Sequence, residues 1–308
     1  MSHRTFPEGL TTRSATEADA RIITNLFEAA ETADLGAPEI SLSDVEASLG
    51  YPDFDLDRES LLVFHGDHLV AYADAFHWKA DVAIHPDWRG KGLGNAIVGW
   101  TEQTALERRA PTEETRIGQT IVDTNSAARD LLVGRGYEPR YTSWVLRLPH
   151  DQTLQSGPLP EGYSVRRSEL PEDEHAIYRV IEDAFNEWPN RKPSTFENWR
   201  AWTLDRPDFD PSLLLVVAWE GRIVGASIGL MYPEEGWIHQ IAIERSHRGR
   251  GLAKALLSRS FGEMRRRGAP DVGLSTDSRT GALDLYLALG MVVRRSYTHY
   301  SLLLRAAV

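Results

Sequence analysis

The sequence predicts a mixed α/β layer fold that is built twice along one chain. The first observation is a glycine-rich stretch, HRGRGLAKAL, which begins at His247 and has a counterpart, WRGKGLGNAI, at Trp88. The second is the length of 308 residues, which suits two domains of about 150 residues each. The third is that strand and helix patterns follow the same order around both stretches. Together these observations indicate a duplicated domain.

The duplication extends beyond the glycine-rich stretches to four blocks in the same order. They are PEGLTTR and PEGYSVR, HGDHLVA and WEGRIVG, VAIHPDWRGKGLG and IAIERSHRGRGLA, and NSAARDLLVGRGY and RTGALDLYLALGM. Between the halves, PHDQTLQSGPLP is polar and punctuated by proline and glycine, as a linker is. We therefore expect an N-terminal domain over 1–149, a linker over 150–160 and a C-terminal domain over 161–308.

The elements of the first half follow from capping signals and apolar periodicity. Thr16 with Asp19 resembles a capping box ahead of a helical stripe of apolar residues that starts at Ile22. Apolar runs predict strands over 61–64, 69–76 and 81–84, and the glycine-rich loop then opens a helix. A strand over 117–122, a short helix over 126–133 and a closing strand over 141–148 complete the unit.

The second half repeats this series. Strands are expected over 213–218, 223–230 and 237–243, followed by the loop and a helix. The spacing of that helix predicts a buried face made of Leu256, Leu257, Ser260, Phe261 and Met264.

Composition narrows the classes of function. The net charge of −11 argues against a general nucleic-acid binder; it either favours cationic small molecules as partners or simply keeps the protein soluble. No apolar run approaches the ~20 residues of a membrane helix, and no secretory signal is evident, so we expect a cytoplasmic protein with no membrane partner. The oligomeric state stays open.

Metal and thiol chemistry are not expected either. The chain has no cysteine, which excludes disulfides, thiolate metal sites and a cysteine nucleophile. Its ten histidines show no H-E-x-x-H spacing, so the sequence predicts no metal site.

The glycine-rich loops are typical of an anion site. Each follows a strand and opens a helix, where unpaired backbone N–H groups and the helix dipole attract negative charge. Arg248 and Arg250, or Arg89 and Lys91, are expected to add charge at the rim. The spacing does not fit a P-loop, and the loops come too late in each unit for a Rossmann fingerprint. A cradle for a pyrophosphate remains.

The pattern R-x-x-G-x-G/A resembles motif A of the GNAT N-acetyltransferase superfamily. It is carried by Arg89, Gly92 and Gly94, and again by Arg248, Gly251 and Ala253. The later phrase LDLYLALGM resembles the motif B helix of the same superfamily, and the tandem layout is most similar to the mycothiol-synthase-like acetyltransferases of actinobacteria. The resemblance implies two domains, each a mixed, mostly antiparallel sheet flanked by helices.

The resemblance also implies acetyl-CoA as the co-substrate, with its pyrophosphate on the loop amides and its pantetheine arm along the strand before each loop. In the first half the implied residues are Val82, Ala83, Ile84, Arg89, Gly90, Lys91, Gly92, Leu93, Gly94 and Asn125. In the second half they are Ile241, Ala242, Ile243, Arg248, Gly249, Arg250, Gly251, Leu252 and Ala253.

The two halves differ at the expected acid. A tyrosine on the motif B helix usually supplies a proton or hydrogen bond to the thiolate leaving group, and Tyr286 occupies that place. The gapless alignment puts Leu132 there in the first half. We therefore expect the second half to catalyse. The first half either binds acetyl-CoA or its fragment for structural or regulatory reasons, or is a relic whose helix merely packs, and Tyr286 itself is alternatively a core residue.

The general base is less well indicated. Related enzymes often place a glutamate where this chain has Trp237 and, in the first half, Trp78. His239 lies on the same strand face as Trp237 and is a candidate base, directly or through water, or a structural histidine. Glu187 is a weaker candidate, and a low-pKa amine or water alone would need no base. The tryptophans of residues 185–202 line an acceptor pocket or belong to the core.

These features predict an N-acetyltransferase that acts on a primary amine of a small molecule. Direct attack within a ternary complex is expected because no nucleophile is available for an acyl-enzyme. The alternatives are a peptide or protein amine as acceptor, and a non-catalytic sensor that binds acyl-CoA. Longer acyl donors also stay possible, since the loop contacts only the coenzyme A part.

Overall fold

The computed structural model describes residues 6–108, 115–188, 191–233 and 235–304. The chain forms two compact units: unit 1 comprises Met1–Thr142 and Tyr297–Val308, and unit 2 comprises Ser143–Ser296. These bounds differ from the expected ones, because residues 143–148 belong to unit 2 and the end of the last strand belongs to unit 1.

Unit 1 contains two antiparallel groups of strands, in the orders β1–β2–β3–β4 and β5–β12. The strands are β1 (Leu10–Arg13), β2 (Ser60–His65), β3 (His68–Asp74), β4 (Val82–Ile84), β5 (Thr115–Val122), the beginning of β6 (Glu138–Leu148) and the end of β12 (Val292–Leu304). The helices are α1 (Ala20–Leu35), α2 (Leu42–Leu49), α3 (Leu56–Glu59), α4 (Leu93–Glu107) and α5 (Ser126–Gly134).

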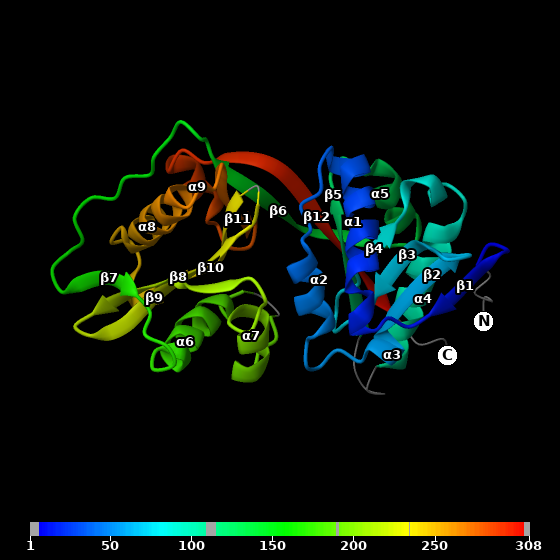
Figure 1. The fold of residues 1–308 in the computed structure, drawn as a ribbon, viewed down its shortest axis with the longest axis horizontal. Helices are drawn as coiled ribbons and strands as arrows, with labels where there is room; N and C mark the ends of the chain where they lie inside the picture. The colour runs from blue at the N-terminus through cyan, green and yellow to red at the C-terminus, as the bar shows by residue number, and fades with distance from the viewer. Residues whose placement is uncertain (1–5, 109–114, 189–190, 234, 305–308) are drawn as a thin grey trace. The chain divides into compact units, whose positions relative to one another are not determined.

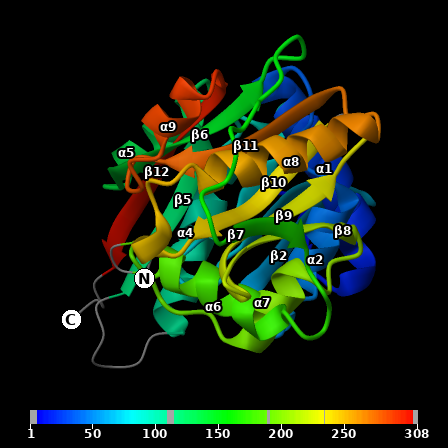
Figure 2. The same ribbon diagram turned by 90° about the vertical axis from the view of Figure 1, so that its left-hand side faces the viewer.

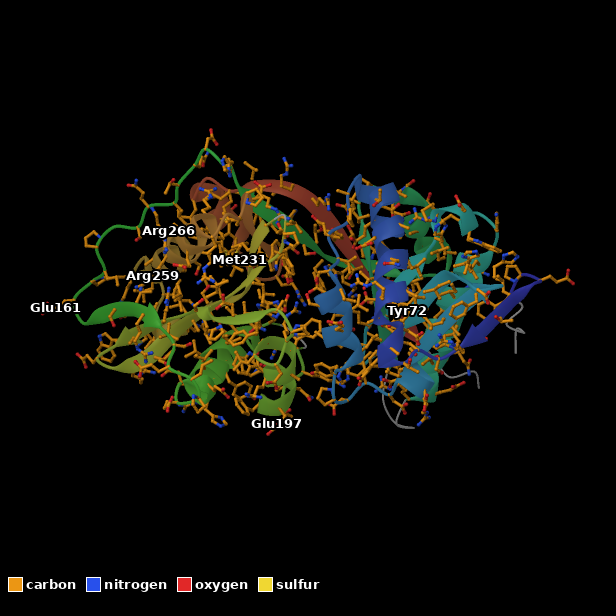
Figure 3. The ribbon with its side chains drawn as sticks, in the orientation of Figure 1. Tyr72, Glu161, Glu197, Met231, Arg259 and Arg266 are labelled. Carbon is orange, nitrogen blue, oxygen red and sulfur yellow. The ribbon has the colours of Figure 1, made fainter. Side chains whose placement is uncertain are left out.

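Helices cover both faces of the first sheet in unit 1. Ala83 belongs to the core beneath α1 and α2, together with Tyr72, which Figure 3 shows beside α1. Val82 and Ile84 pack into the opposite core, beneath α4. This alternation is the period of two that a strand imposes on its side chains. Asp19 accepts a hydrogen bond from the Thr16 N–H at 2.8 Å, at the capping box predicted before α1.

Unit 2 contains a sheet of order β6–β11–β10–β9–β8–β7, in which only β10 and β11 are parallel. Besides the end of β6, its strands are β7 (Tyr163–Arg167), β8 (Phe209–Trp219), β9 (Arg222–Met231), β10 (Glu235–Ile243) and β11 (Asp271–Asp277), and the beginning of β12 also lies in this unit. The helices are α6 (Glu174–Phe185), α7 (Phe196–Thr203), α8 (Leu252–Arg266) and α9 (Leu283–Ala288). Figure 2 shows α8 and α9 on one face of the sheet and α6 and α7 on the other.

The predicted inner face of α8 is confirmed, since all five of its residues are buried. The helix lies close to the sheet because Gly229 and Gly236 face Met264. An added Cβ at either glycine would come within 2.7 Å of the Met264 side chain. Close packing fixes α8, and with it the loop that precedes the helix.

The two halves exchange their closing strands. Residues Tyr297 to Leu304 of β12 pair with β5 of unit 1 (Figure 1), whereas residues Ser143 to Leu148 of β6 pair with β11 of unit 2. Each unit therefore completes its sheet with a strand from the other half of the duplicated sequence.

A chain that ends at Ser296 is expected to lose the fold of unit 1. It would lack the ladder on β5 and the buried side chains of Tyr300 and Leu304. Burial of such side chains contributes roughly 1.5–3 kcal/mol each. Urea unfolding and limited proteolysis should show an unfolded unit 1, while a control chain that ends at Leu304 should match the full protein. An equal urea midpoint for both chains would contradict the exchange.

Candidate active site

The strands β10 and β11 separate in the middle of unit 2. They pair in parallel from Glu235 to Ile238, whereas β10 continues to pair with β9 as far as Ile243. The register between β10 and β9 shifts between Ile238 and Gln240, which makes His239 the extra residue of a β-bulge. Past the bulge, the edge of β10 that faces β11 carries backbone groups able to pair with an extended ligand.

The glycine-rich loop follows this free edge. Gly249 and Gly251 have φ values of +75° and +77°, and an added Cβ at either one would meet no atom within 4 Å. Gly251 is the N-cap of α8 and offers no capping side chain, so the first N–H groups of the helix are left for a ligand. Gly90 and Gly92 repeat these features before α4, with φ values of +72° and +83°. Both loops therefore fit a pyrophosphate.

Arg248 braces the loop instead of adding charge at the rim as expected. Its Nε donates to the Ile243 carbonyl at 2.9 Å, and its two Nη atoms each lie 2.8 Å from the carboxylate of Glu187. The pKa of Glu187 is lowered, and the main cause is that Arg248 donates these hydrogen bonds to its carboxylate. The Glu187 carboxylate is thus engaged in an ion pair, which makes it a poor general base.

Arg89 makes the same brace in unit 1. Its Nε donates to the Ile84 carbonyl at 3.3 Å, and its Nη atoms bind Asp34 at 2.5 and 3.1 Å. Asn125 also donates to Asp34, at 2.9 Å, while its side-chain oxygen caps α5. These residues, predicted as cofactor ligands, hold the loop to the end of α1.

The other predicted cations stay at the loop surface. Arg250 donates to the Ser246 carbonyl at 2.7 Å and is exposed. Lys91 is also exposed, with its ammonium 5.0 Å from the centre of the Trp88 ring. Both leave positive charge beside a glycine-rich loop.

Tyr286 lies on α9 and packs into the core of unit 2 beside α8. The structure records no hydrogen bond from its hydroxyl to any described residue, and the side chain keeps 8 % exposure. Burial raises the pKa of Tyr286 to about 12. The corresponding residue of α5, Leu132, is also buried, so only unit 2 has a hydroxyl at this place.

The bulge of β10 is covered by α7. Trp199 is buried and donates from Nε1 to the Gln240 side chain at 3.0 Å. The Trp202 ring lies 6.2 Å from the half-buried ring of His239. Of the tryptophans in residues 185–202, Trp199 thus belongs to the core, whereas Trp202 lies beside the candidate base.

Trp237 cannot replace the glutamate of related enzymes in proton transfer. Its ring lies 5.1 Å from the Arg147 guanidinium, which also forms an ion pair with Glu235. At the position where related enzymes often have a glutamate, this chain thus has a tryptophan ring in cation–π contact with Arg147.

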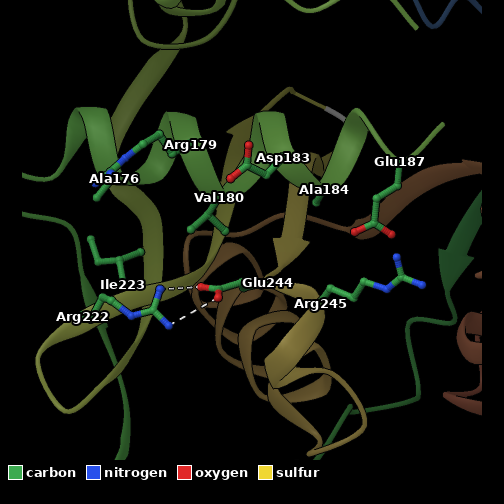
Figure 4. Close-up of a pocket in the computed structure, with 10 residues that line it drawn as sticks. All are labelled: Ala176, Arg179, Val180, Asp183, Ala184, Glu187, Arg222, Ile223, Glu244 and Arg245. Atoms are coloured by element: carbon green, nitrogen blue, oxygen red, sulfur yellow. Dashed lines mark hydrogen bonds and ion pairs between the residues drawn. The ribbon is translucent and has the colours of Figure 1, made fainter. Parts of the chain in front are cut away.

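A pocket of about 310 Å³ opens between α6 and the strand ends that precede the loop (Figure 4). Its lining consists of Ala176, Arg179, Val180, Asp183, Ala184, Glu187, Arg222, Ile223, Glu244 and Arg245. Arg222 and Glu244 form an ion pair of 2.6 Å on the side of the pocket opposite α6. The pocket shares Glu187 with the brace of the loop, so its charged wall adjoins the glycine-rich loop.

Two further features of the described residues concern membranes and metals. None of the helices in these parts of the chain is long and apolar enough to span a bilayer. No group of three or more histidine, aspartate or glutamate side chains placed to hold a metal ion occurs in them either.

Comparison with known proteins identifies the family. The model of the acetyltransferase (GNAT) family matches residues 24–137 and again residues 174–291. The chain belongs to the GNAT acetyltransferase family. Each match contains one glycine-rich loop, so this GNAT enzyme carries the donor-binding motif twice.

Relatives of this GNAT enzyme match over most of their length. The mycothiol acetyltransferase of Thermobispora bispora is 27 % identical over 89 % of this chain and 93 % of its own, and that of Salinispora arenicola is 30 % identical over 76 % of each. Among solved structures, a GCN5-related N-acetyltransferase from Sphaerobacter thermophilus is 33 % identical, covers 99 % of this chain and 98 % of its own, and has a TM-score of 0.79. A tandem GNAT protein of the clavulanic acid pathway shares the fold at 15 % identity, over 97 % of this chain and 100 % of its own, with a TM-score of 0.74.

Proposed function

We propose that this GNAT enzyme transfers the acetyl group of acetyl-CoA to a primary amine of a small molecule, and that unit 2 catalyses the transfer. The observation that carries the proposal is the combination in unit 2 of a glycine-rich loop, a strand edge that opens at a bulge and the hydroxyl of Tyr286. Unit 1 has a glycine-rich loop as well, but its strand β4 pairs with β3 without a register shift, and Leu132 stands in place of the tyrosine.

The donor would bind along β10 and its loop. Its pyrophosphate would accept hydrogen bonds from the N–H groups at the start of α8, and its pantetheine arm would pair with the backbone of residues 240–243. The backbone N–H of Ile241 is the expected donor to the oxyanion that forms on the thioester carbonyl.

The chemistry begins with deprotonation of the acceptor, because a free ammonium has a pKa near 10. His239, at the bulge, is the candidate that would take this proton, directly or through water. The amine then attacks the carbonyl carbon, the C–N bond forms and the C–S bond breaks. A second nitrogen proton goes to the departing thiolate and the third stays on the nitrogen, so the products are an amide and a thiol.

Tyr286 would assist the leaving thiolate by a hydrogen bond. Its pKa of about 12 lies above the value near 8.5 of an ordinary thiol, so complete transfer of its proton to the thiolate is unfavourable. A charge-assisted hydrogen bond from a neutral hydroxyl still stabilises the developing negative charge.

The acceptor class is supported by the relatives, several of which are mycothiol acetyltransferases. We also propose that the loop of unit 1 binds acetyl-CoA, because its glycines repeat the φ values and open space of the second loop.

The test combines calorimetry with free-thiol release. We expect acetyl-CoA to bind and at least one amine among ethanolamine, tyramine, spermidine and glucosamine to support saturable thiol release. Tight binding without release on any amine would identify a sensor instead of an enzyme. Release with peptide amines alone would identify a peptide or protein acetyltransferase.

A further inference from the structure

Unit 1 contains a cluster of four titratable residues where β3 meets β4. Asp74 and Asp81 lie opposite each other: the Asp74 N–H donates to the Asp81 carbonyl at 2.9 Å, and the Asp81 N–H donates to the Asp74 carboxylate at 3.1 Å. The Tyr72 hydroxyl donates to Asp74 at 3.1 Å, and the Lys79 ammonium lies 2.8 Å from Asp81. Neither catalysis by unit 2 nor the glycine-rich loops use this cluster.

The cluster lies where β4 and β5 separate. Lys79 bridges Gly118 in parallel, and the Ala80 N–H donates to the Gly118 carbonyl at 2.8 Å. After Ala80, the residues of β4 (Val82–Ile84) pair with β3. In the repeat, Val82 corresponds to Ile241, so Asp81 directly precedes the residue whose N–H would meet a thioester in unit 1.

The two carboxylates differ in their exposure to solvent. The Asp81 side chain is 43 % exposed, whereas Asp74 is 7 % exposed and lies on the face of the sheet that α1 covers. The ammonium beside Asp81 shows that this carboxylate accommodates a cationic amine. Its Lys79 side chain is itself half-exposed, so a ligand can take its place.

Unit 2 shows that the fold does not require these charges. By the repeat and the strand registers, the positions of Asp74 and Asp81 are occupied there by Ile228 and Gln240. A buried carboxylate opposite a second carboxylate costs stability relative to such residues. Because the two aspartates cost stability and the fold does not need them, we expect them to have a function in unit 1.

We propose that unit 1 is a second acetyl-transfer site, in which Asp81 binds the ammonium of a small amine and Asp74 accepts its proton. The proposal rests on the proposed function, since it needs acetyl-CoA on the loop that contains Gly90 and Gly92. The free amine attacks the thioester carbon, the C–N bond forms and the C–S bond breaks. The second nitrogen proton goes to the thiolate, and the proton on Asp74 returns to water.

The protonation of Asp74 suits this role. Burial, and next the charge of Asp81, raise the pKa of Asp74 to about 7, while Lys79 and the hydrogen bonds from the Asp81 N–H and Tyr72 oppose the rise. A base of this pKa is half deprotonated at neutral pH and still accepts a proton well. Because only the deprotonated form accepts, turnover in unit 1 should increase as the pH rises through about 7.

The experiment isolates unit 1 by silencing the other loop with Gly251→Val. In this background we expect thiol release with at least one of ethanolamine, tyramine, spermidine and glucosamine. Asp81→Asn or Asp74→Asn should lower that release at least tenfold, and Lys79→Gln should lower the KM for the amine. Asp130→Asn, at an exposed aspartate of α5, is the matched control and should change nothing. Thermal melting checks that each variant is folded.

Several outcomes would overturn the second site. One is an inactive Gly251→Val chain beside an active Gly92→Val chain, which leaves catalysis by unit 2 intact. Another is equal activity of the Asp81→Asn and Asp130→Asn variants. Absence of thiol release by the unaltered chain with the same amines would remove the proposed function and this inference together.

Discussion

Gly251→Val is expected to weaken acetyl-CoA binding at unit 2 by about 100-fold or more. Gly251 has a φ of +77° and faces open space, so its Cβ would strain the backbone and project toward the ligand. Loss of two charge-assisted hydrogen bonds, at roughly 1.5–3 kcal/mol each, accounts for such a change. Calorimetry measures it as the loss of one of two binding sites.

Gly268→Val is the matched control for that substitution. Gly268 follows α8, has a φ of +92° and also has nothing within 4 Å of an added Cβ. It therefore carries a similar backbone strain, of the order of 1–2 kcal/mol, without facing the proposed ligand. Equal losses of affinity in both variants would mean that strain, and not the anion site, causes the effect.

In a Gly92→Val background, which leaves unit 2 as the active unit, Tyr286→Phe is expected to lower kcat by about 10- to 100-fold and to leave the Kd of acetyl-CoA unchanged. The substitution removes a hydrogen bond to the leaving thiolate, worth roughly 1.5–3 kcal/mol in the transition state. The free energy of unfolding should change little, because the hydroxyl has no partner among the described residues. Steady-state thiol release at several acetyl-CoA concentrations separates the two constants.

The pH profile gives a second readout for Tyr286. Burial disfavours the phenolate and raises its pKa to about 12, so the side chain stays protonated over the range in which the enzyme is assayed. In the Gly92→Val background, the profiles with and without Tyr286→Phe should have the same shape below pH 11. Tyr300→Phe, at another buried tyrosine, is the control that should keep full kcat. A decline in rate near pH 10 that disappears in Tyr286→Phe would contradict this assignment.

Local signals in the sequence were sufficient for the loops and for the contrast between Tyr286 and Leu132. Glycine before a helix reports a backbone requirement at that point, and a gapless repeat transfers positions between halves. The predicted strands at 61–64, 213–218 and 223–230 lie within β2, β8 and β9 because each has an apolar run of its own. The short helix α2 is not predicted, although Ser41 is a recognisable cap.

Pairings between distant segments could not be predicted in the same way. The bulge at His239 is a property of two strands in register, and the braces of Arg89 and Arg248 depend on acids 55 and 61 residues away. The exchange of β6 and β12 was missed because either strand fits either sheet by pattern alone. The signal for Asp74 and Asp81 was present, as aspartates at the ends of otherwise apolar strands.

The exchange of closing strands has a consequence for synthesis in the cell. On the ribosome, the first half of the chain emerges early but cannot finish its sheet until Leu304 has been translated. The edge of β5 stays unpaired while the whole second half is translated, and an open strand edge is prone to aggregation during that time. Fission of the gene at the linker would therefore separate each half from the strand that closes it, which ties the duplicated halves into one inseparable polypeptide.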